Sequence, residues 1–145
     1  LGAGPREDYH ASYEAEKLLP AWLRWGGAVY AQRFFQDASV GPDGDAWWAR
    51  TWSLDNLEQR GGLRPLADVL AFRMNPDYRD DALKLLLEAG VLVSFVVDGE
   101  CAPVVAAHAE LKRALAAGNA KKAQVEALTA ALSANEAALR AFLGR

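Results

Sequence analysis

Few residues in this sequence have the types and spacing that catalysis or metal binding requires. The two histidines, His10 and His108, lie far apart, and neither belongs to an HExxH or similar ligand spacing. The single cysteine, Cys101, follows Gly99-Glu100 at the start of a predicted helix, where backbone N–H groups can activate a thiol. No histidine partner for it is identifiable. We therefore predict no catalytic residue, no metal site and no cofactor, which favours a non-enzymatic protein.

Acidic residues gather in three turn-rich segments that could in principle supply paired carboxylates for acid–base chemistry. These segments are "GPDGD" at 41–45, "DNLEQRGG" at 55–62 and "NPDYRDD" at 75–81. The first fails the calcium-loop template, because Arg50 stands where the bidentate glutamate should be. Since Asp, Asn, Gly and Pro are the residues that form turns and helix caps, we expect most of these carboxylates to have that role.

Aromatic residues offer the strongest candidate for a binding surface. Five tryptophans fall between residues 22 and 52, and two of them are adjacent and close to an arginine. Aromatic and arginine side chains are enriched at the centres of protein interfaces. Two adjacent residues on a helix cannot both face the core, so one tryptophan of the pair should be exposed. Together with two residues from the apolar stretch 91–97 and the turn after it, the candidate partner-binding residues are Trp47, Trp48, Arg50, Phe95 and Asp98.

Length and charge restrict the class of protein and of partner. A chain of 145 residues, 52% of them hydrophobic, can bury one core without disulfides or metal, which predicts a single domain over residues 1–145. The net charge is -3, and no basic run could neutralise nucleic-acid phosphates. No apolar run reaches the roughly 18 residues of a membrane-spanning helix. We therefore expect the partner to be another protein, with no nucleic acid and no membrane involved.

Helical patterns dominate the chain, so the predicted fold class is mostly α, built from stacked helical hairpins. Leu18, Trp22, Trp25 and Val29 recur at helical spacing in the first third. The alanine-rich last third breaks at Gly118-Asn119, which predicts a helical hairpin. The expected organisation is N-terminal helices at 9–62, a central helix-loop-helix unit at 63–102 and a C-terminal hairpin at 103–145.

The second arm of the hairpin carries a coiled-coil-like apolar stripe with one polar position. Its members follow alternating steps of three and four residues. They are Val125, Leu128, Leu132, Asn135, Leu139 and Phe142. Such a stripe must be covered, either by the hairpin's first helix at 104–115 or by a second chain. The small alanines around it permit close approach within one chain, so we predict intramolecular packing and a monomer.

The segment 81–103 combines a helix signal with a strand signal. Capping acids before it and Gly90 after it predict a helix over Leu83–Ala89, with the leucines at 85, 86 and 87 partly or fully buried. Six of the seven residues from Val91 to Val97 are apolar and several are β-branched, which suits a short β element. The alternative is the apolar finger of a helical repeat.

Residues 63–108 resemble an ankyrin repeat. The Pro-Leu start in "RPLADVLA" at 64–71, the "LKLLLEAG" ending at 83–90 and the spacing to Pro103 carry this resemblance. It implies that Pro65 and Pro103 begin equivalent helices stacked side by side, with a turn finger between 90 and 103. The unit is degenerate, because Arg64 and Ala67 replace the turn-forming Thr and His and the interval between the prolines exceeds the family period of about 33 residues.

These observations favour a helical protein-interaction domain with an ankyrin-like centre. An immunity protein, an antitoxin or an adaptor would be natural roles, and the richness in Ala, Leu, Gly and Arg is typical of bacteria. The alternatives are a small enzyme or ligand-binding domain built on the Trp-rich segment 22–52, and a structural oligomer joined through the C-terminal stripe. Cytoplasmic localisation is the default expectation, and a periplasmic one would follow if a signal peptide were removed before Leu1.

Overall fold

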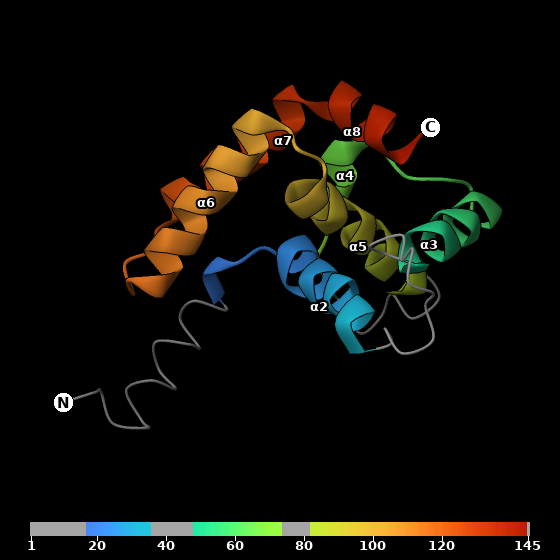
Figure 1. Ribbon diagram of the computed structural model, residues 1–145, viewed down its shortest axis with the longest axis horizontal. Coiled ribbons are helices and arrows are strands. Elements are labelled where there is room, and N and C mark those ends of the chain that lie inside the picture. Colours follow the sequence, from blue (N-terminus) through green and yellow to red (C-terminus); the bar gives the residue numbers. More distant parts are fainter. Residues whose placement is uncertain (1–16, 36–47, 74–81, 145) are drawn as a thin grey trace.

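The structure, a computed structural model, describes residues 17–35, 48–73 and 82–144. Within these ranges every regular element is a helix, which confirms the predicted mostly α fold (Figure 1). None of the described helices is both long and apolar enough to cross a membrane. In chain order the helices are α2 (Ala21–Phe35), α3 (Trp48–Gln59), α4 (Leu66–Ala71), α5 (Ala82–Asp98), α6 (Ala102–Ala116), α7 (Lys122–Ala134) and α8 (Glu136–Leu143).

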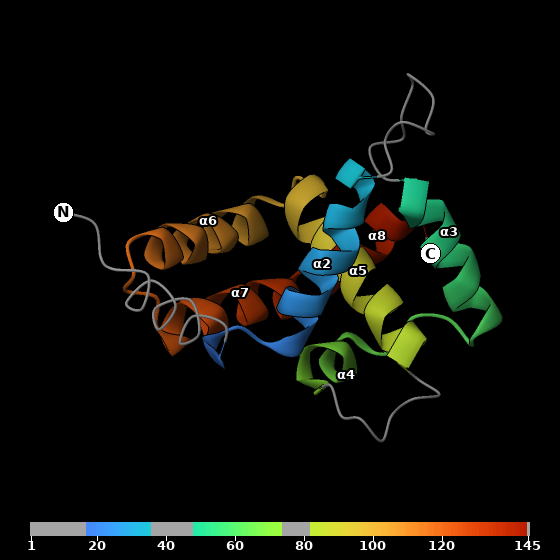
Figure 2. The ribbon, with the colours of Figure 1, turned by 90° about the horizontal axis from the view of Figure 1, so that it is seen from below.

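Helix α5 forms the centre of the fold. It packs against α2, α3, α4, α6 and α8, and all ten residues from Leu87 to Val96 are buried. A helix that is apolar on all sides is stable only when other elements surround it, and here α3 lies on one side and the α6–α7 hairpin on the other (Figures 1 and 2). The rest of the molecule is therefore organised around this one segment.

The continuity of α5 corrects the sequence-based interpretation of residues 91–97. The helix does not end at Gly90 but runs on to Asp98, so these residues form neither a β element nor a turn finger. A short apolar run has no periodicity that separates a buried strand from a buried helix, and burial overrides the β preference of valine. The predicted burial of Leu85 and Leu87, with Leu86 half-buried, is confirmed.

The ankyrin resemblance stays a prediction, and the geometry departs from it in two places. A helix occupies the position of the finger. Pro65 precedes α4 and Pro103 lies in the first turn of α6, as expected, but α4 has 6 residues and α6 has 15. The two helices that follow the prolines therefore differ in length.

A close helix crossing joins α2 to α5. Gly26 is buried, and a Cβ atom at this position would overlap the carbonyl oxygen of Ala89 and lie 2.8 Å from Cγ2 of Val93. The neighbouring Gly27 has open space where a Cβ would be. The absence of a side chain at residue 26 thus allows the two backbones to touch.

The predicted C-terminal hairpin is confirmed, and it projects from one side of the fold (Figure 2). Gly118 adopts φ +70°, and the backbone N–H of Asn119 donates to the carbonyl oxygen of Ala114 at 2.9 Å. These are features of a helix that ends in a left-handed residue. Helices α6 and α7 then pack against each other, with Leu111 of the first and Leu128 of the second fully buried.

The apolar stripe of the second arm is covered within one chain, as predicted. Leu128, Leu132 and Leu139 are buried, and Phe142 stacks at a tilt on Phe95 with ring centroids 5.6 Å apart. The arm is not one helix, however. Asn135 has φ -120°, and its side-chain Nδ2 donates to the carbonyl oxygen of Ala131 at 2.8 Å, so α7 ends and α8 starts in a new direction. The break turns α8 back onto α5.

Candidate functional site

Of the five predicted partner-binding residues, the structure describes the side chains of Phe95 and Asp98 only, and these two lie in different environments. Trp47 lies outside the described residues, and Trp48 and Arg50 belong to the first turn of α3 with side chains that are also outside the description. Phe95 is only 1% exposed and packs on Phe142, so its ring faces the core and is not available to a partner in this fold. Asp98 alone falls at a described surface, at the end of α5.

The carboxylate of Asp98 is held by a tyrosine from another helix. The hydroxyl of Tyr30 in α2 lies 2.9 Å from both Oδ1 and Oδ2 and donates to the carboxylate. Tyr30 itself is buried. The contact therefore ties the end of α5 to α2.

Beside Asp98 lies an exposed apolar surface that the sequence did not single out. Val97 in the last turn of α5 is 45% exposed and Val105 in the first turn of α6 is 44% exposed. Residues 97–101 span at most about 14 Å, and residues 101–105 form one helical turn of about 6 Å. The two valines therefore border the same short connection. We call this surface, formed by Val97, Asp98, Glu100, Ala102, Pro103, Val105 and Ala106, the α5–α6 corner.

Glu100 occupies an unusual backbone conformation within the corner. Its φ is +52°, the left-handed region, and no other non-glycine residue in the described ranges has a positive φ. This region costs a residue with a Cβ about 1 kcal/mol and is usually filled by glycine. The Glu100 side chain is exposed and makes no hydrogen bond or ion pair with the described part of the chain. A free carboxylate is thus held out at the centre of the connection.

Cys101 follows Glu100 as the residue that precedes α6. Its thiol is free and half-buried, and its side chain makes no capping hydrogen bond to the helix. Among the described residues, no group of three His, Cys, Asp or Glu side chains could hold a metal ion. His10 lies outside the described ranges, so the carboxylates around it in the sequence are outside them too.

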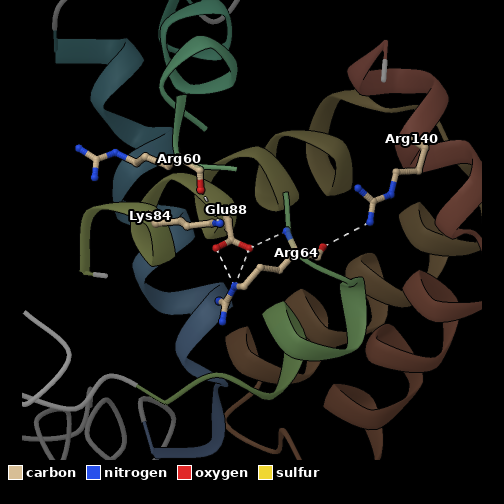
Figure 3. Close-up of polar contacts among 5 residues, drawn as sticks. All are labelled: Arg60, Arg64, Lys84, Glu88 and Arg140. Atoms are coloured by element: carbon tan, nitrogen blue, oxygen red, sulfur yellow. Dashed lines mark hydrogen bonds and ion pairs between the residues drawn. The ribbon is translucent and has the colours of Figure 1, made fainter. Parts of the chain in front are cut away.

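A second polar feature, which the sequence also did not reveal, fastens the loop between α3 and α4 (Figure 3). Glu88 of α5 is fully buried, and its carboxylate accepts hydrogen bonds from Arg64 Nε at 2.9 and 3.1 Å and from the Arg64 backbone N–H at 3.2 Å. Lys84 Nζ donates to the carbonyl oxygen of Arg60 at 2.9 Å. Arg140 of α8 donates to the carbonyl oxygen of Arg64 at 3.3 Å.

The chemistry of this cluster is structural. Lys84 and Arg140 donate hydrogen bonds to backbone carbonyl oxygens of the loop, and Glu88 accepts hydrogen bonds from Arg64. The cluster therefore positions residues 60–64 between α5 and α8. A small pocket of about 130 Å³ lies beside it, lined by Arg64, Lys84, Leu85 and Glu88. Both oxygens of Glu88 already accept hydrogen bonds from Arg64. The carboxylate is therefore engaged and is not free to act as a general base.

A larger and mostly apolar pocket of about 210 Å³ lies against the same loop. Its walls come from the end of α3, the loop and α8. The lining residues are Leu54, Leu57, Glu58, Gly62, Leu63, Arg140 and Leu143. Arg140 also pairs with Glu136 at 3.0 Å, so its charge is balanced within α8.

The Trp-rich segment does not come together as a site in the described residues. Trp22 is buried in the core, whereas Trp25 on α2 is 40% exposed. The side chain of Trp52 is outside the description. The first two tryptophans therefore face opposite environments and do not share a binding surface.

His108 in α6 has a shifted pKa. Burial lowers the pKa of this imidazole below its usual 6.5, and the nearby charge of Lys112 lowers it further. The unfolded chain therefore binds a proton at a higher pH than the folded one does. The fold should consequently lose stability as the pH falls below about 6.5 towards the lower folded pKa.

Replacement of His108 by glutamine should remove part of this pH dependence. We expect the melting temperature of the native protein to fall more between pH 7.5 and pH 5.5 than that of His108→Gln, as measured by circular dichroism. His10 is present in both proteins, so its titration cancels in the comparison. Equal decreases would show that His108 does not differ between the folded and unfolded states.

Comparison with known proteins does not indicate a function, so a function has to be inferred from the surfaces described above. No protein-family model matches the chain, and neither a curated protein nor a solved structure shows significant similarity to it.

Proposed function

We propose that this chain is a helical protein-interaction domain that binds its partner through the α5–α6 corner. The observation that carries the proposal is the exposure of Val97 and Val105 on the two sides of one short connection. Contiguous exposed apolar patches, unlike scattered apolar residues, mark interaction sites. Burial of both by a partner would contribute favourably to binding through the hydrophobic effect.

The corner is rigidly supported, which favours binding without a large loss of conformational entropy. Val96 precedes Val97 and is buried in the core, and Val104 precedes Val105 and is fully buried. Each exposed valine is therefore next to an anchoring residue on the same helix. A preformed surface of this kind binds more tightly than one that must be ordered on contact.

The cellular roles we propose all depend on binding another protein: an immunity protein, an antitoxin or an adaptor, in a bacterial cell. We further propose that the chain acts as a monomer, since the apolar stripe that could have joined two copies is covered by its own helices.

Capture of partners by matched variants tests the proposal. The native protein, Val97→Gln/Val105→Gln and Leu83→Gln would be immobilised and exposed to an extract of the cells that naturally make the protein. Leu83 is also exposed but lies in the first turn of α5, at the opposite end from Val97, so its variant is the control. We expect quantitative mass spectrometry to show proteins retained by the native chain and by the control but depleted at least about tenfold on the double variant.

Substitutions at exposed positions usually change stability by less than about 0.5 kcal/mol, so all three proteins should melt alike. The same set of proteins on all three surfaces would place binding elsewhere. No enrichment over a blank surface would argue against an interaction domain.

A further inference from the structure

We draw no further inference here: the strongest candidate, the mostly apolar pocket of about 210 Å³ between the end of α3, the loop at 60–64 and α8, carries none, because nothing in the described residues shows what would occupy it and the arginine in its lining, Arg140, is already paired with Glu136.

Discussion

Gly26→Ala should destabilise the protein by about 3 kcal/mol, at the upper end of the range for overpacking a core. The new methyl group would overlap the carbonyl oxygen and carbon of Ala89, and these are backbone atoms of the central helix that no rotamer change can move. The crossing of α2 and α5 would have to widen, and the buried side chains along it would lose contacts. For a chain of this length the melting temperature should fall by roughly 10 °C.

Gly27→Ala provides the matched control, because the same methyl group is added one residue away. Nothing lies within 4 Å of its new Cβ, and alanine is favoured over glycine inside a helix by up to about 1 kcal/mol. We therefore expect this variant to be as stable as the native protein or more so. Thermal melts of the two variants, followed by circular dichroism, decide the question. A Gly26→Ala protein that melts like the native one would contradict the close crossing.

The crossing also shows what the sequence could and could not predict about the fold. Helical periodicity located α2 and the C-terminal hairpin, because an amphipathic or alanine-rich segment has a repeat that can be counted. In the sequence, Gly26-Gly27 is only a pair of weak helix formers, since which glycine faces a neighbouring helix depends on packing. In the same way, Gly90 signalled a helix end, and only the surrounding helices make a continuous α5 the better way to bury Val91 and Val93.

The candidate surface was harder to predict than the fold for a related reason. Asp98 was found because a turn signal follows it, but Val97 and Val105 differ from their buried neighbours Val96 and Val104 only in the direction they face. That direction is fixed by the angle between α5 and α6. Glu100 carried one usable signal, since it follows Gly99 at a predicted turn where a positive φ is common. Nothing in the sequence paired Arg64 with Glu88, which lie 24 residues apart.

Arg64→Ala should destabilise the fold by about 3 kcal/mol, the lower end of the range for removing one partner of a buried ion pair. The two partners are unequally placed, since the side chain of Glu88 is 0% exposed and that of Arg64 is 34% exposed. Without Arg64, the buried carboxylate of Glu88 loses its charged partner and water cannot replace it. Without Glu88 the guanidinium can turn towards solvent, so Glu88→Leu should cost clearly less than Arg64→Ala.

The double variant Arg64→Ala/Glu88→Leu separates the charge effect from lost packing. Once the buried carboxylate is absent, removal of Arg64 leaves no uncompensated charge, so the second substitution should cost under about 1 kcal/mol. Lys84→Met, which removes only the exposed hydrogen bond to Arg60, should stay within about 0.5 kcal/mol of the native protein. Urea unfolding at constant pH gives these free energies. Equal costs of Arg64→Ala with and without Glu88 would mean that the arginine stabilises the loop by packing alone, and the ion pair would then have no part in joining residues 60–64 to α5.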